Sequence, residues 1–220
     1  ANAWSTYTAE FYNMKAMLSG RIGYTGMNRR GYMRNGMAPD NSQGKSGTAN
    51  FLDGGVKGSL NVDMGRGHAF SIGAGYELRA PMANTAFIAP EISNDFVTNL
   101  KNERIFSSEF SYLYRNAWLS ANVSGYYSRL ENVTEWQNFY NDDENSFTYV
   151  SMTGLKKEYY GVEVGAKIKL TSWLDLKTLG AMSEAKNINN VNAVYMLSKS
   201  AEVYQDKAYV MNMRESGTPL

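Results

Sequence analysis

Apolar and polar side chains alternate strictly between Phe70 and Arg79, and this is the clearest pattern in the chain. One face of the segment carries Phe70, Ile72, Ala74, Tyr76 and Leu78. The opposite face carries Ser71, Gly73, Gly75, Glu77 and Arg79. A repeat of two is typical of a β-strand with one apolar face and one polar face. The pattern therefore predicts a strand over residues 70–79.

The same alternation recurs along the chain and predicts about eight long strands. They cover residues 13–25, 56–64, 70–79, 106–114, 119–127, 160–170 and 174–182, with one returning strand that ends near Arg214. Strands of ~10 to 14 residues exceed the ~5 to 6 that are usual in soluble sheets. Such lengths match the span that a tilted strand needs to cross a bilayer.

The predicted connections are short at one end of the strands and long at the other. Tight turns fall near Gly65, Arg115 and Thr171. Long polar loops cover about 26–53, 80–102 and 130–156, and a fourth begins at Glu184. This asymmetry is typical of outer-membrane barrels, which have short periplasmic turns and longer outer loops. The sequence therefore predicts an all-β fold, an antiparallel transmembrane β-barrel segment with lipid outside and a wet lumen inside.

Composition is compatible with this fold and excludes several functions. The 220 residues carry a formal net charge of +1, so the basic patch that nucleic-acid binding requires is not indicated. The chain has no cysteine, which excludes disulfides and thiolate metal sites. No run approaches the ~20 apolar residues of a membrane helix. The mean hydropathy of −0.44 still fits a barrel, because lipid-facing and lumen-facing residues alternate along each strand.

Aromatic residues gather toward both ends of the predicted strands. Near the turns these are Phe70, Tyr112, Tyr114, Trp118 and Trp173, and near the loops Tyr24, Tyr76, Tyr126 and Tyr159. Two aromatic bands are favoured where a membrane protein meets the two lipid–water interfaces. A soluble β-sandwich is the alternative that gives similar alternation, although its strands are usually shorter.

The segment from Ala69 to Arg115 carries a resemblance that goes beyond periodicity. Residues 69–81 read AFSIGAGYELRAP, and residues 99–104, which open the next strand, read NLKNER. Further motifs are GYYSR at 125–129, KEYYGVE at 157–163 and ESGTP at 215–219. In order and spacing these motifs resemble the barrel of TonB-dependent outer-membrane receptors, particularly those of Bacteroidetes.

The resemblance implies the domain organisation and the function. Residues 1–220 would be a partial barrel domain from the C-terminal half of a 22-strand barrel, without the plug domain and the closing strands. The chain shows no signal peptide at Ala1, which agrees with a fragment. The implied activity is uptake of a scarce nutrient (siderophore, glycan, peptide or cobalamin) across the outer membrane of a Gram-negative bacterium. The implied partners are outer-membrane lipid and the TonB complex, which would act through the missing N-terminal part, and a surface lipoprotein is a further candidate.

The sequence contains few residues in patterns that suit catalysis or metal binding, so we expect the protein to be no enzyme and to hold no cofactor. The single histidine, His68, precludes histidine clusters and is better explained as a polar residue beside a turn. The acidic run at 142–145 lacks the spacing and the glycine of an EF-hand, so a solvated loop is expected. Glu103 and Glu109 share a strand face, which predicts a hydrated inner wall rather than acid–base catalysis.

Aromatic and basic residues in the predicted outer loops are the candidate ligand-binding residues. They are Arg29, Arg30, Tyr32, Arg34, Phe87, Trp136, Phe139, Tyr140 and Tyr149. Exposed aromatics can stack on sugars or hydrophobic ligands, and arginines can meet an anionic ligand. The same residues can instead anchor loops or face lipopolysaccharide.

Two further classes of function remain as alternatives at this point. A passive porin-like barrel would have strands with the same alternating pattern, but its gene would encode no plug domain and no TonB box. A soluble β-rich carbohydrate-binding module would remain monomeric without detergent, whereas exposed barrel strands would not.

Overall fold

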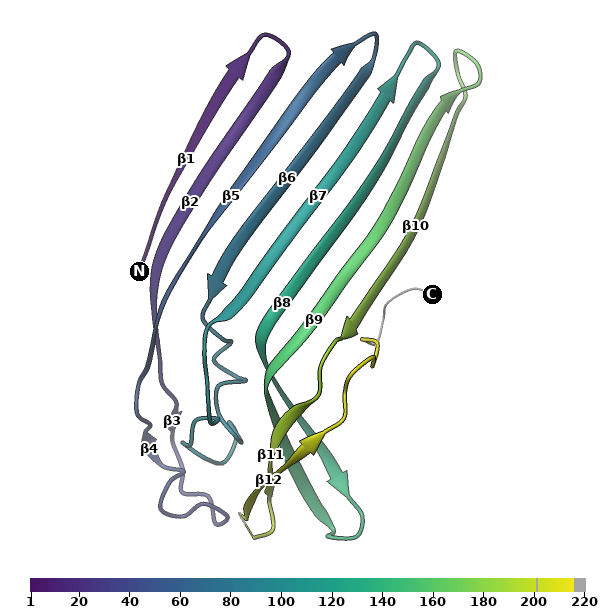
Figure 1. Ribbon diagram of the computed structural model, residues 1–220. Helices are drawn as coiled ribbons and strands as arrows, with labels where there is room; N and C mark the ends of the chain where they lie inside the picture. Colours follow the sequence, from purple (N-terminus) through teal and green to yellow (C-terminus); the bar gives the residue numbers. More distant parts are fainter. Residues whose placement is uncertain (201, 216–220) are drawn as a thin grey trace.

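The computed structural model describes residues 1–200 and 202–215, which form β-strands and no helix (Figure 1). Ten strands make one antiparallel sheet in the order β1-β2-β5-β6-β7-β8-β9-β11-β12, with β10 also paired to β9. The strands are β1 (Asn2–Phe11), β2 (Met14–Met27), β5 (Ala49–Gly65), β6 (His68–Arg79), β7 (Glu103–Arg115), β8 (Leu119–Asn141), β9 (Ser146–Lys169), β10 (Asp175–Asn187), β11 (Val191–Leu197) and β12 (Val203–Ala208). A separate ribbon pairs β3 (Arg30–Gly31) with β4 (Gly44–Lys45). The predicted all-β, antiparallel class is confirmed.

Four tight turns lie together at the upper end of the sheet in Figure 1. They connect β1 to β2 at 12–13, β5 to β6 at 66–67, β7 to β8 at 116–118 and β9 to β10 at 170–174. The turns predicted near Gly65, Arg115 and Thr171 are therefore confirmed. All longer connections lie at the opposite end, which we call the loop end.

Strand β1 is an element that the sequence pattern did not predict. It pairs with β2 along its whole length, from Asn2↔Gly23 to Phe11↔Met14. Its alternation is weak, because one face mixes small and polar residues with two aromatics and the other includes Trp4. The number of long strands, eight, agrees with the prediction, but β1 takes the place of the predicted long returning strand.

The prediction of a loop over residues 130–156 is wrong. Strands β8 and β9 continue through this range, reach 23 and 24 residues, and turn only at 142–145. The register shifts between Leu130 and Glu135, where Asn132 has a φ of 58° and Gly154 on β9 has a φ of 79°. Such bulges bend a strand and change which face a side chain takes, so the alternation that identifies the strands near the tight turns is lost here.

The predicted returning strand near Arg214 is replaced by shorter pieces. Strand β11 pairs with the far half of β9, at Thr148–Met152, and β12 pairs with β11. Arg214 itself makes one antiparallel bridge with Lys186 on β10. The chain thus returns to the edge of β10 only at its last described residues.

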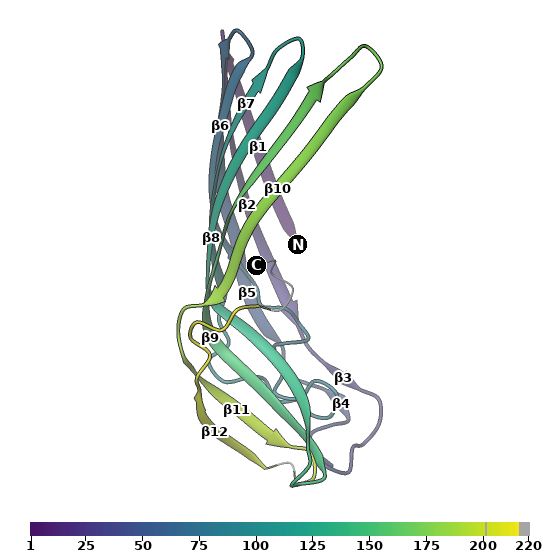
Figure 2. The same ribbon diagram turned by 90° about the vertical axis from the view of Figure 1, so that its right-hand side faces the viewer.

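The sheet has two chemically different faces. Strand register aligns Ala16, Leu60, Ile72, Phe110, Gly125, Val162 and Met182 in one row across seven strands. We call this side the outer face, and its large apolar residues, such as Leu18 and Ile22 at 58% exposure each, have no layer packed on them. The opposite, polar side is the inner face. Figure 2 shows that the two lateral edges of the sheet bend toward the same side, so the sheet is a trough rather than a flat plane.

Buried apolar cores occur only at the loop end of the described structure. One core combines residues 88–97 with Tyr149, Val194 and Met196. A second lies between the extended β8–β9 hairpin and β11–β12, around Leu155. A third joins Met27 and Phe51 to Ala86 and Phe87. The loop end is therefore a packed cap, whereas the strands between it and the tight turns are single-layered.

Candidate functional site

The inner face contains a polar hollow of about 770 Å³ that spans β1 to β8. Three glycines, Gly55, Gly73 and Gly75, leave its floor without side chains. A Cβ on Gly55 would lie 2.9 Å from the carbonyl oxygen of Tyr76, and one on Gly75 would lie 3.1 Å from Lys57 Cβ. Pairs of hydroxyl groups also line the hollow, for example those of Ser107 and Ser128, whose Oγ atoms are 3.0 Å apart.

An ion-pair cluster lies at the loop-side end of this hollow. Arg21 Nη1 is 3.0 Å from Asp53 Oδ1, and Arg21 Nη2 donates to Glu77 Oε1 at 2.8 Å. Asp53 is nearly buried and also accepts a 2.6 Å hydrogen bond from Thr25. The carboxylate fits because position 23 is glycine, whose Cβ would lie 2.4 Å from Asp53 Oδ1. A buried carboxylate needs such partners, because an unpaired one would lose its hydration without compensation.

The two glutamates predicted to line a hydrated wall have different environments. Glu103 is buried, and its Oε2 accepts hydrogen bonds from Arg79 Nε at 2.9 Å and Nη2 at 2.6 Å. The hydrated-wall prediction is therefore wrong for Glu103. Glu109 is exposed and, like Lys57, makes no ion pair within the described residues. These two side chains are available to water or to a passing solute.

The loop of residues 80–102 folds over the inner face instead of projecting away from it. Phe87 and Phe96 stack with ring centroids 4.5 Å apart and pack against Met27 and Phe51. Register places Met27 and Phe51 on the same side as the polar hollow. The loop therefore covers the loop-side mouth of the trough.

Arg29 joins this loop to the preceding one, residues 28–48. Its Nε donates to the Pro90 carbonyl at 2.7 Å, and Nη2 to the Glu91 carbonyl at 3.1 Å. Its Nη1 donates to the Ser42 carbonyl at 2.9 Å and to Asn94 Oδ1 at 2.5 Å. One guanidinium thus ties both loops into one cap, because arginine offers five donors in a fixed planar array.

Trp136 and Tyr149 hold the extended hairpin against the same cap. Trp136 Nε1 donates to the Ile88 carbonyl at 3.1 Å, and its ring stacks with that of Tyr149 at 5.8 Å. The Tyr149 hydroxyl donates to Glu91 Oε2 at 3.3 Å. Burial, together with the charge of Glu91, raises the pKa of Tyr149, which therefore keeps its proton and remains a donor.

The structure divides the nine predicted ligand-binding residues into two groups. Arg29, Phe87, Trp136 and Tyr149 make the packing contacts of the cap described above. The other five, Arg30, Tyr32, Arg34, Phe139 and Tyr140, are exposed. Binding by these five remains a prediction.

The exposed residues form two small groups at the loop end. Arg30 lies over the Tyr32 ring at 5.8 Å, and Arg34 Nη2 is 3.4 Å from Asp40 Oδ1. On the tip of the β8–β9 hairpin, Tyr140 packs edge-on against Phe147 at 5.4 Å and donates to Asn145. Neither group lines the polar hollow.

One buried charge cluster was missed by sequence reasoning. Lys157 is nearly buried where β9 bends, and its Nζ donates to Glu135 and Glu215. The Tyr159 hydroxyl also donates to Glu215, at 2.7 Å. Glu215 lies 58 positions from Lys157 along the chain, so no local pattern indicates this pairing.

His68 and the possible metal ligands were the remaining candidates for chemistry. His68 Nδ1 is 2.6 Å from the Tyr112 hydroxyl beside the turn, which agrees with a polar turn residue. Residues 1–200 and 202–215 contain no group of three or more His, Cys, Asp or Glu side chains that could hold a metal ion. The same residues contain no helix long and apolar enough to cross a membrane.

Comparison with solved structures shows which known fold the sheet resembles. The chain is similar to the copper transporter OprC, with a TM-score of 0.70 and 16% identity, over 89% of this chain and 32% of that one. It therefore spans about a third of that protein's length. At this identity the likeness shows the fold alone, that of an antiparallel segment of barrel wall. No protein-family model matches the sequence, and no curated protein matches it either.

Proposed function

We propose that this chain is barrel wall from an outer-membrane transport protein. The observation that carries the proposal is the contrast between the faces of one single-layered sheet. Apolar side chains such as Ile22, Leu52 and Val56 are exposed on the outer face, while a polar hollow lies on the inner face. Exposed apolar area of this extent is unfavourable in water and favourable against lipid. The likeness to a transporter supports the same conclusion.

The finer proposal is a TonB-dependent receptor of the Bacteroidetes type. It is supported by the motifs over residues 69–115 and by the cap, which narrows the loop-side mouth of the trough. In this account the outer loops capture a scarce nutrient: a siderophore, glycan, peptide or cobalamin. A partner complex then supplies energy through a part of the protein outside this chain, and a surface lipoprotein would assist capture.

The proposed experiment measures ion conductance of the full-length protein, purified from outer membranes, in a planar lipid bilayer. A receptor should give no steady conductance, because its lumen is closed until an energised partner opens it. A stable open channel would instead support the passive porin-like barrel. Recovery of the protein from a soluble fraction, with none in the outer membrane, would support the soluble binding module and contradict the transport proposal.

A further inference from the structure

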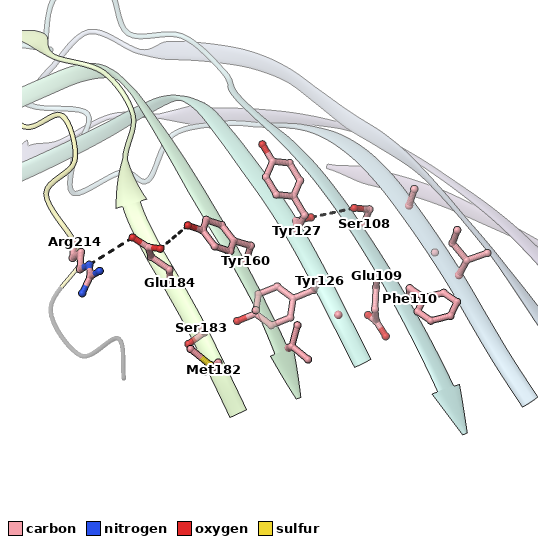
Figure 3. Close-up of a pocket in the computed structure, with 16 residues that line it drawn as sticks. Ser108, Glu109, Phe110, Tyr126, Tyr127, Tyr160, Met182, Ser183, Glu184 and Arg214 are labelled. Carbon is pink, nitrogen blue, oxygen red and sulfur yellow. Dashed lines mark hydrogen bonds and ion pairs between the residues drawn. The ribbon is translucent and has the colours of Figure 1, made fainter. Parts of the chain in front are cut away.

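The polar hollow on the inner face holds two charged side chains that have no partner among residues 1–200 and 202–215. Lys57 on β5 and Glu109 on β7 both line this hollow, and both are exposed. The ion pairs of the described residues include neither of them, and no dashed line reaches Glu109 in Figure 3. Unpaired charges on the wall of a cleft attract solute groups of the opposite sign. These two side chains can therefore hold a ligand by its own charged groups.

Two glycines of β6 separate the unpaired charges. Strand register places Lys57 opposite Gly75, and Glu109 opposite Gly73. Because neither glycine has a side chain, a solute can lie directly on the backbone of β6 between the two charges. Neighbouring strands are ~4.8 Å apart, and the two residues are two strands and one row apart, so their Cα atoms are separated by about 12 Å.

The other charges of the hollow neutralise one another in the ion-pair cluster described above. There Arg21 contacts both Asp53 and Glu77. Together with Lys57 and Glu109, the hollow holds two cations and three carboxylates, so a purely anionic ligand is not favoured. A ligand with one group of each sign, in contrast, can neutralise both unpaired side chains.

Uncharged polar groups and one tryptophan make up much of the remaining wall. The Thr6 and Ser19 hydroxyl oxygens are 2.9 Å apart, and Trp4, on the same side of β1, is 75% exposed. At the other side of the hollow, Tyr126 lies opposite Glu109 on the neighbouring strand, and both are labelled in Figure 3. Aromatic rings such as that of tryptophan cover apolar groups of a ligand while their polar atoms stay hydrated. The wall thus offers hydroxyl groups and an aromatic ring to the middle of a ligand whose ends are charged.

We propose that the polar hollow binds a short zwitterion, a free oligopeptide of about two to four residues. Its carboxylate contacts Lys57, and its ammonium group contacts Glu109. An extended chain covers ~3.3–3.6 Å per residue, so this length spans the gap between the two side chains. A neutral glycan would leave both charges without a counter-charge. The inference rests on the proposed function, because it names the class of ligand that the inner face of the transporter receives.

The test titrates the full-length protein in detergent with trialanine and follows binding by calorimetry. N-acetylated trialanine and C-amidated trialanine are the comparison probes, because each lacks one of the two charges. Blocking either end should weaken binding on the order of 10-fold, since each removes one charge-assisted hydrogen bond.

Variants of the two side chains identify which end of the peptide each one contacts. K57Q should weaken binding of trialanine on the order of 10-fold but leave binding of the C-amidated form unchanged. E109Q should do the same for trialanine and the N-acetylated form. The matched controls are E163Q and K177Q, which remove inner-face charges of β9 and β10 outside the hollow. Both should bind all three probes as the unmodified protein does.

A further variant tests the hollow independently of charge. G73L should cover the floor and weaken all three probes about equally. Its Cβ has room, since the nearest atom, the carbonyl oxygen of Gly58, is 3.6 Å away. The control is G180L on the outer face of β10, where nothing lies within 4 Å of the added Cβ, and it should leave binding unchanged.

The outcomes separate this inference from the proposed function. Equal binding of the free and blocked peptides, or unchanged trialanine binding in K57Q and E109Q, would overturn the zwitterion site. Binding of maltotriose that G73L abolishes, with no binding of trialanine, would show that the hollow takes a glycan instead. Any of these results in a protein that fractionates with the outer membrane leaves the transport proposal standing.

Discussion

Arg29 and Arg30 are adjacent in the chain, yet they have opposite environments. Arg29 donates hydrogen bonds to two carbonyls of the 80–102 loop and to Asn94, whereas Arg30 is exposed and contacts the Tyr32 ring. Because hydrogen bonds from a charged donor contribute more than neutral ones, Arg29 should decide whether the cap stays closed.

Replacing Arg29 with alanine should loosen the cap without unfolding the sheet. Losing several charge-assisted hydrogen bonds, at ~1.5–3 kcal/mol each, should cost about 3 kcal/mol or more of local stability. Hydrogen exchange should then accelerate about 100-fold at Ile88, Ser93 and Val97, whose amides bond within the loop. R30A is the control and should leave these amides protected. Unchanged protection in R29A would show that the apolar contacts alone hold the cap.

The sequence shows which aromatic residues lie outside the regular alternation, but it does not show whether each of them packs against the protein or binds a ligand. Phe87, Trp136 and Tyr149 were predicted as candidate ligand contacts because loop aromatics suit binding. The structure buries Phe87 and Tyr149, and Trp136 packs against the same cap. Their neighbours come from other loops, so neither spacing nor composition near each residue distinguishes packing from binding.

At the scale of elements, the turn at Arg66–Gly67 brings two hairpins together. Gly67 has a φ of 83° and its carbonyl accepts a 2.7 Å hydrogen bond from the Arg115 amide. A Cβ at this position would lie 1.7 Å from the Arg115 carbonyl oxygen. The β5–β6 turn therefore fits the β7–β8 turn only with glycine here.

Replacing Gly67 with alanine should lower the unfolding midpoint of the reconstituted protein in urea. The left-handed backbone conformation alone lowers the free energy of unfolding by roughly 1–3 kcal/mol for a residue with a side chain. The clash with Arg115 adds to this cost, so the two hairpins must shift apart. G65A is the matched control, since Gly65 has a φ of 75° but open space around its Cβ. Equal midpoints for G65A and G67A would contradict the close approach of the two turns.

The parts of the strands next to the tight turns were predictable because one physical pattern, the alternation of apolar and polar side chains, defines them. Alternation with a period of two identified most of β2, β6 and β7, as well as the parts of β5, β8, β9 and β10 nearest the turns. Beyond the bulges between Leu130 and Glu135 both faces meet protein or water, so alternation no longer marks the strand. Strand β1 was missed because small residues on its outer face give little contrast.

At the scale of the whole molecule, the trough combines a single-layered wall with a packed cap. The wall exposes apolar side chains on one face and charges on the other, and the cap covers the mouth at the loop end. This separation was predictable in outline from alternation and loop length. The inward fold of residues 80–102 depends on long-range contacts such as that of Arg29 with Pro90, which no local pattern encodes.

The measurement that tests the account most directly is cysteine labelling of Glu163 and Val164 in intact outer membranes. The 220 residues contain no cysteine, so E163C and V164C each add one reporter at nearly the same depth on β9, on opposite faces. With a small hydrophilic maleimide added to both sides of the membrane, E163C should react and V164C should not, while a lipid-soluble maleimide should reverse the order. Equal hydrophilic labelling of both positions would contradict an outer face that meets lipid, and with it the barrel wall.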